Sequence, residues 1–290
     1  MEKRILISNL PKISAIYFAL LQCGYDYYAV EKDAALVEKI EGFRMTQGNF
    51  DNPFFSEVKQ NTCEVYSYWP RAAALETATF FMDFNMQFKN FDVYRKNIMS
   101  ASNISDIERN QAFWEWIEGF PTALGSVLGS KEFQAYLNWE NGWLEQQNLI
   151  RKKDLLHIQK ILNICATNYA SPIQKVSVIL NPIKCAYSAD YHMYGSQLLF
   201  CSGSFRPESV IHEFLHHIVH PLVKEHKVII LQCHVPYPDI DSSYYLTGGE
   251  NGTLNAFEEY MVRKLANVVL TGDFPSDLSM FLNGLLHGIS

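Results

Sequence analysis

The chain has 290 residues, of which 48% are hydrophobic and 19% charged, so it can bury a substantial core and is not expected to be disordered. Its formal net charge of −7 argues against a phosphate-binding surface, and therefore against nucleic acid as a partner. No run approaches the ~20 apolar residues that span a bilayer, and no signal peptide is apparent, so we expect no membrane span and a cytoplasmic location by default.

Residues 1–170 are predicted to be mostly helical. Apolar residues at helical spacing predict a first helix that Pro11 opens and Gly24 ends. A second predicted helix covers Asp33–Ile40 and ends at Gly42. Further helices are expected over 70–91, 107–118, 131–144 and 153–168, and the run 119–122 is expected to break two of them.

The pattern changes near Ser171-Pro172. Two strands are predicted, at Lys175–Leu180 and at Gln197–Cys201. A helix over Glu208–His220 should stop at Pro221. A short apolar run at 228–231 and a loop over 234–252 precede a final helix at 254–270. We therefore expect a predominantly helical α+β fold, in which a helical region, 1–170, joins a small sheet-plus-helices catalytic region, 171–290.

The segment His212-Glu213-Phe214-Leu215-His216 carries the clearest chemical signal. Residues four apart lie on one face of a helix, so His212 and His216 can bind one zinc ion. Glu213 can then take a proton from the water that the metal activates. A chance match to this pattern is expected only about 0.02 times in a chain of this composition. The alternative is a helix whose histidines lie in its core or on its surface.

Two further histidines follow in the same helix. Residues eight apart are separated by ~12 Å along a helix, so His220 cannot share an ion with His212. We expect His220 to interact with the dipole at the helix C-terminus, and His217 to pack or to support the site rather than bind metal.

A catalytic zinc needs a third protein ligand. The final predicted helix offers Glu258 and Glu259, and the two are not equivalent. The helical wheel places Glu258 among apolar residues, where a carboxylate would need a partner such as a metal. Glu259 is favoured by the resemblance described next, and Ala266, two turns later, leaves room for the other helix to approach. Arg263 has two possible partners. It can form an ordinary i, i+4 pair with Glu259, or it can bind a carboxylate of the substrate.

These two helices resemble those of the gluzincin metallopeptidases, in which a glutamate on a second helix completes the HExxH site. The chain is also similar to a bacterial branch with an HEFxH helix and a later E-x-x-V-R helix, and the run Leu20-Leu21-Gln22-Cys23-Gly24-Tyr25 resembles the opening of that branch. The resemblance implies Glu259 as the third ligand.

The expected function is therefore that of a zinc metallopeptidase acting on a peptide or protein, with Glu213 as general base and Zn²⁺ held by His212, His216 and Glu259. A zinc hydrolase of non-peptide amides, and a helical binding protein whose zinc site is structural or lost, are the alternatives. An extended substrate is expected to bind along the strand at 197–201. The alternative is that this segment is a simple core strand with no role in binding. Tyr244, Tyr245 and His192 are candidates for stabilising an oxyanion.

Overall fold

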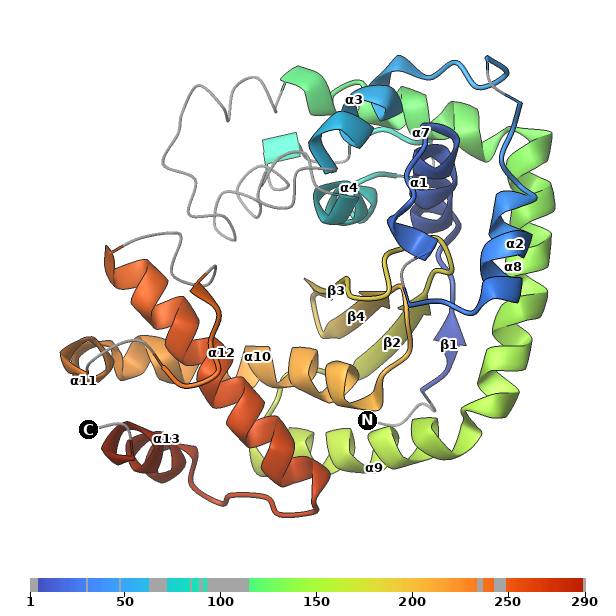
Figure 1. Cartoon of the computed structure of the whole chain (residues 1–290). Coiled ribbons are helices and arrows are strands. Elements are labelled where there is room, and N and C mark those ends of the chain that lie inside the picture. Colours follow the sequence, from blue (N-terminus) through green and yellow to red (C-terminus); the bar gives the residue numbers. More distant parts are fainter. Residues whose placement is uncertain are drawn as a thin grey trace.

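The computed structural model describes residues 5–29, 31–46, 48–62, 72–83, 85–88, 91–92, 115–233, 237–242 and 249–288. Helices surround a small mixed sheet, which confirms the predicted helix-rich α+β class (Figure 1). The sheet has the strand order β1-β2-β4-β3. Its strands are β1 (Ile7–Ser8), β2 (Lys175–Leu180), β3 (Ala189–Tyr194) and β4 (Gln197–Ser202).

The pairing within the sheet decides which strand lies at its edge. β1, β2 and β4 run parallel, whereas β3 is antiparallel to β4. Both predicted strands are confirmed, as β2 and β4. The strand at 197–201 was expected to be either a substrate-binding edge strand or a core strand. β4 is paired on both sides, so it is a core strand, and in the described part of the chain β3 forms the outer edge.

The strand β3 was not predicted from its sequence. Ala and Asp are depleted in strands, and the segment Ala189–Tyr194 contains no β-branched residue, although it has two tyrosines. A tight turn creates the strand instead. Gly195 has a φ of +59°, which a short hairpin connection requires, and it folds β3 back onto β4.

One face of the sheet packs on helices from the first half of the chain (Figure 1). Ile179, Leu199 and Cys201 belong to this core, together with apolar side chains of α1 and α7. The elements of this half are α1 (Pro11–Gln22), η1 (Tyr27–Ala29), α2 (Ala34–Glu41), α3 (Pro53–Thr62), α4 (Ala72–Thr79), α7 (Phe120–Leu128) and α8 (Lys131–Ile150).

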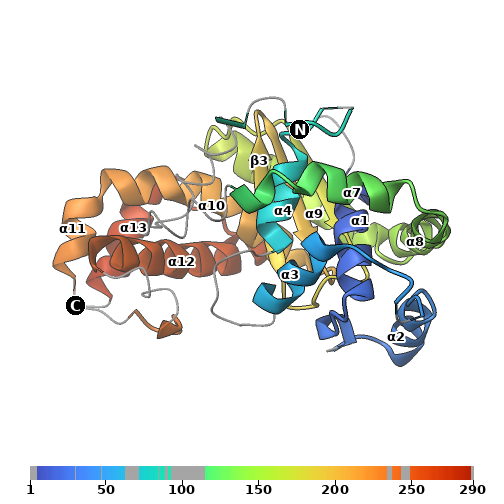
Figure 2. The ribbon, with the colours of Figure 1, turned by 90° about the horizontal axis from the view of Figure 1, so that it is seen from above.

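The opposite face of the sheet forms a second core. Val178, Leu198 and Phe200 pack there with apolar side chains of α9, α10 and α12. In Figure 2, α10 and α12 extend side by side away from the sheet, with α13 next to them. These helices are α9 (Lys152–Asn168), α10 (Pro207–Glu225), α11 (Lys227–Gln232), α12 (Gly249–Leu270) and α13 (Leu278–His287).

Several predicted helices need correction in the first half of the chain. Among the described residues of the helix expected over 70–91, α4 is the part that is confirmed, because the chain turns after Thr79 and residues 82 and 88 form an isolated β-bridge. The break expected at 119–122 is present slightly earlier, since helical residues 115–117 are followed by a turn at 118–119. The helix α7 then begins at Phe120, with Pro121 in its first turn, where proline is tolerated. Most of the helix predicted over 107–118 lies outside the described residues.

The helix α10 also differs from its prediction, because it continues through Pro221 to Glu225. Proline removes one main-chain hydrogen bond and usually ends a helix. Here Val219 and Val223, on either side of Pro221, are buried in the core shared with α9 and α12, and this packing stabilises the helix beyond the proline.

The two regions divided at residue 170 share the sheet, since β1 of the first region pairs with β2 of the second. Each core also contains residues of both regions. None of the helices in the described part of the chain is long and apolar enough to span a bilayer.

Candidate metal centre

The helix α10 presents His212 and His216 on one face, one turn apart. Pro207 occupies its first turn, and its opposite side, which includes Phe214 and Leu215, is fully buried in the core. The two imidazole rings lie 4.9 Å apart, and their Nε2 atoms are separated by 3.2 Å. Both ring nitrogens that point away from the backbone thus face the same point beside α10.

The third side chain at this point is Glu259 of α12. Its Oε2 atom lies 3.4 Å from Nε2 of His212 and 3.6 Å from Nε2 of His216. The helical wheel had placed Glu258 on the apolar face, but it is Glu259 that is buried, at 5% exposure, whereas Glu258 is only partly buried. The structure therefore brings together the three residues that were predicted as metal ligands.

The spacing of these three atoms fits a zinc ion. Four ligands placed tetrahedrally at the 2.0–2.1 Å bonds that zinc forms with nitrogen and oxygen are ~3.3 Å from one another. The observed separations are 3.2, 3.4 and 3.6 Å. Two imidazoles and one carboxylate are also a donor set that zinc accepts, so the residues present fit the ion.

Glu258 lies on the far side of His216 and orients it. Its Oε1 atom is 2.9 Å from Nδ1 of His216, and its Oε2 atom is 2.6 Å from Nδ1 of His220. Burial acts to raise the pKa of Glu258, but the hydrogen bonds with these two histidines outweigh burial and lower it. The prediction that His220 interacts with the C-terminal end of its helix is wrong. α10 continues past this residue to Glu225, and His220 binds Glu258 instead.

Arg263 fixes the other oxygen of Glu259. Its Nε donates to Oε1 of Glu259 at 2.6 Å, and its Nη1 donates to the main-chain carbonyl of Asp239 at 2.7 Å. Burial opposes ionisation of Glu259, but the hydrogen bonds with His212, His216 and Arg263 lower its pKa. Of the two partners considered for Arg263, the i, i+4 pair is the one present.

Glu213 follows His212 on α10, in a partly buried position beside the two histidines. Burial raises its pKa, and so do the charges of Asp190 and Glu259, whereas His216 and His212 lower it. A carboxylate in such surroundings holds a proton more readily than one in water.

Tyr191 of β3 is a neighbour of the site that sequence reasoning missed. Its ring stacks on His216, with centroids 5.6 Å apart and planes within 11° of parallel. Burial and the charges of Glu258 and Glu213 raise the pKa of Tyr191 to about 12, so its hydroxyl remains a hydrogen-bond donor at neutral pH. No sequence signal pointed to it, because β3 itself was not predicted.

Of the remaining candidates, His217 and His192 have other partners. His217 hydrogen-bonds Ser171 at 2.6 Å and also Phe214, which fits the expected packing role. His192 projects from the opposite face of the sheet, where it binds Glu76, and is not placed to stabilise an oxyanion near α10. Tyr244 and Tyr245 lie outside the described residues.

A cavity of about 630 Å³ opens elsewhere in the molecule, near the N-terminal end of α10. Trp139, Trp143 and Arg206 line part of it, and none of the three candidate ligands does. The cavity is therefore separate from the group of His212, His216 and Glu259.

Comparison with family models, with curated proteins and with solved structures gave no match to this chain.

Proposed function

We propose that this protein is a zinc-dependent hydrolase, and specifically a peptidase, whose metal is held by His212, His216 and Glu259. One observation carries the proposal: the ligand atoms of these residues, drawn from two helices, lie 3.2 to 3.6 Å apart, at the spacing of a tetrahedral zinc site.

A catalytic role is favoured over a structural one because the site has three candidate ligands and is open on one side. Structural zinc sites are closed by four protein ligands, whereas catalytic sites leave one position open. The side chain of His212 is 21% exposed, compared with 6% for Glu259, so the open side lies next to His212. Zinc bound here would act as a Lewis acid and lower the pKa of a water molecule to near neutral.

Glu213 is the proposed general base. It follows His212 directly, on the helix that carries both histidines, and its partly buried carboxylate can accept a proton from the attacking water and pass it to the leaving amine. Glu258 and Arg263 keep His216 and Glu259 in position, since each binds the atom of its partner that does not face the metal position.

A peptide is the proposed substrate because an edge strand lies beside α10. The site helix contacts β3 through the stack of Tyr191 on His216. An extended peptide can add to an exposed strand edge through main-chain hydrogen bonds. The edge expected at 197–201 is unsuitable, because β4 is already paired with both β2 and β3. The resemblance to gluzincins supports the same substrate class.

Metal analysis of the full chain, purified without chelator, tests the metal site. We expect His212→Ala to lose the zinc bound at this site, and His157→Ala, at an exposed position of α9, to keep it. A protein that takes up less than ~0.2 zinc per chain on titration would contradict the proposal.

Hydrolysis is tested separately, against a library of peptides. Glu213→Gln should retain zinc and lose cleavage by about 100-fold or more, because the base is removed and the ligands are not. Unchanged cleavage by this variant would rule out Glu213 as the base. Activity limited to non-peptide amides would reject the peptidase assignment while leaving the metal site intact.

A further inference from the structure

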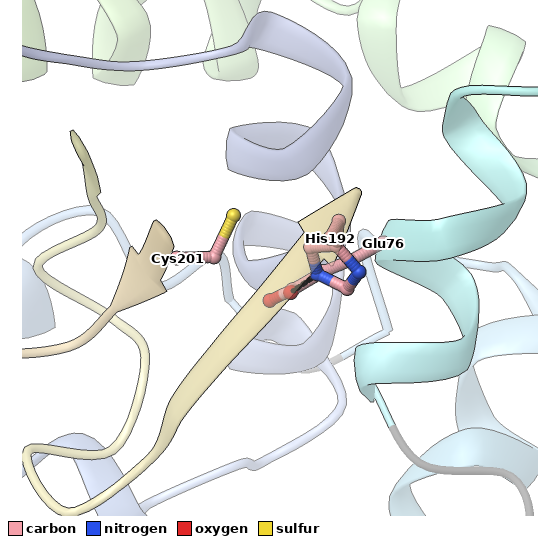
Figure 3. A group of neighbouring side chains, drawn as sticks. All are labelled: Glu76, His192 and Cys201. Atoms are coloured by element: carbon pink, nitrogen blue, oxygen red, sulfur yellow. Dashed lines mark hydrogen bonds and ion pairs between the residues drawn. The ribbon is translucent and has the colours of Figure 1, made fainter. Parts of the chain in front are cut away.

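A second group of metal-binding side chains lies on the other face of the sheet. Glu76 of α4, His192 of β3 and Cys201 of β4 lie beside one another there (Figure 3). Their exposures are 0%, 9% and 1%, so the group is closed to solvent. One ligand atom from each residue lies within 4.8 Å of the other two. None of these residues takes part in the site on α10.

We propose that Glu76, His192 and Cys201 form a second zinc site, which supplies three protein ligands and is too deeply buried to meet a substrate. The donor set is one thiolate, one imidazole and one carboxylate. Sulfur and imidazole ligands suit zinc and exclude the hard cations Ca²⁺ and Mg²⁺, which take oxygen ligands. Because this group is closed to solvent, a metal there could hold its elements together but could not meet a substrate, in contrast to the partly open group around His212.

The side chains around this group hold its ligand atoms in place. Oε1 of Glu76 accepts hydrogen bonds from the hydroxyl of Tyr17 at 2.6 Å and from Nζ of Lys184 at 2.7 Å. Its other oxygen, Oε2, then points to Nε2 of His192, 2.7 Å away. Nδ1 of His192 lies 3.2 Å from Oγ1 of Thr77. Partners of this kind, bound to the atoms that face away from a metal, fix the orientation of its ligands.

The charges in the cluster favour a further cation. Lys184, which is 1% exposed, bonds the carboxylates of both Glu76 and Asp190, the second at 2.6 Å. Two carboxylates therefore share one lysine, and a net negative charge remains. A metal ion at this position would offset this charge and would also use the sulfur of Cys201.

Small side-chain movements bring the three atoms to zinc distances. Tetrahedral ligands of zinc are ~3.3 Å apart for nitrogen and oxygen and ~3.6 Å apart when one is sulfur. Oε2 of Glu76 and Nε2 of His192 would separate by about 0.6 Å, and the ligand atoms of the group, which lie within 4.8 Å of one another, would approach by at most a little over 1 Å. Rotation of side chains supplies shifts of this size.

A metal at this position would join α4 to the two strands β3 and β4. His192 would be held on one face of β3, while Tyr191 on the other face stacks on His216. The second site would thus fix the strand that lies beside the first site, without touching the residues of that site.

Cobalt substitution of the full chain distinguishes the two sites, because a cobalt–thiolate charge-transfer band in the near ultraviolet requires a sulfur ligand. The group around His212 contains no cysteine. After metal removal by a chelator, titration with Co²⁺ should produce this band, and Cys201→Ala should lose both the band and one bound equivalent. His212→Ala should keep the band. Cys165→Ala removes another buried thiol and is the matched control, with an unchanged band.

Titration without a charge-transfer band, or a band that persists in Cys201→Ala, overturns the second site. Circular dichroism establishes whether each variant folds. If Cys201→Ala does not fold, His192→Gln keeps the thiol and is measured in its place. It should weaken the cobalt affinity that the band reports by at least about 10-fold, and an unchanged affinity would overturn the proposal.

Discussion

Glu258 and Glu259 bind the same imidazole from two sides. Nδ1 of His216 lies 2.9 Å from Oε1 of Glu258, and its Nε2 lies 3.6 Å from Oε2 of Glu259. Successive residues of a helix point ~100° apart, so two neighbouring glutamates reach different nitrogens of one ring because α12 crosses α10 at this point. Their removal should have different consequences.

Zinc affinity separates the two glutamates. Glu259→Gln removes a ligand carboxylate and should weaken zinc binding by more than ~100-fold, whereas Glu258→Gln removes only the partner that orients His216 and should weaken it by about 10- to 100-fold. Competition with a chromophoric chelator measures both. A larger loss of zinc affinity for Glu258→Gln than for Glu259→Gln would indicate that Glu258 is the ligand and that Glu259 is not.

The buried carboxyl group of Glu140 should make the unfolding free energy depend on pH. This buried carboxyl accepts hydrogen bonds from Ser14 and Tyr136, yet burial dominates and raises its pKa from 4.5 to about 7. Between these two values the unfolded chain releases the proton while the folded chain retains it. The protein should therefore lose stability as the pH rises from about 4.5 to about 7, by roughly 3 kcal/mol from this group.

Urea unfolding of the wild type and of Glu140→Gln, between pH 4 and pH 8, isolates this contribution. The amide does not ionise, so the difference in unfolding free energy between the two proteins should change across this range in favour of the variant. Any constant effect of the substitution on hydrogen bonding cancels in the change with pH. A difference that stays flat would show that Glu140 ionises normally.

Gly203 should tolerate no side chain. A Cβ atom there would lie 2.1 Å from the main-chain oxygen of Lys184 and 2.2 Å from that of Cys185. Gly203→Ala should therefore destabilise the protein by about 3 kcal/mol or more, because main-chain atoms would have to move. Gly142→Ala is the control, since its Cβ meets no atom within 4 Å and alanine favours the helix α8. Thermal unfolding should show a lower Tm for Gly203→Ala and no decrease for Gly142→Ala.

The local part of the candidate site could be predicted from sequence. His212 and His216 are one helical turn apart, and a helix alone determines that they share a face. The choice of Glu259 needed more than this, because the helical wheel favoured Glu258, whereas the resemblance and the small side chain of Ala266 favoured Glu259. The crossing of α10 and α12 determines which carboxylate reaches both histidines, and that crossing depends on tertiary packing.

The rest of the fold depends on contacts that no local pattern encodes. β3 is a strand because β4 pairs with it, and α10 continues through Pro221 because apolar residues on both sides of the proline are buried. The group of Glu76, His192 and Cys201 joins residues more than 100 positions apart in the chain, and no spacing rule connects them. These features require the three-dimensional arrangement.

The edge position of β3 predicts where a peptide binds. If a substrate adds to this strand, its main chain should hydrogen-bond the outer edge of Ala189–Tyr194 and slow amide exchange there. The zinc-loaded Glu213→Gln protein, mixed with a peptide chosen from the library, allows binding without turnover. Hydrogen exchange followed by mass spectrometry should then show new protection in β3, while Ala34–Glu41 of α2, which packs in the core on the other face of the sheet, serves as the internal control. Protection that spares β3 would contradict β-strand addition as the mode of binding.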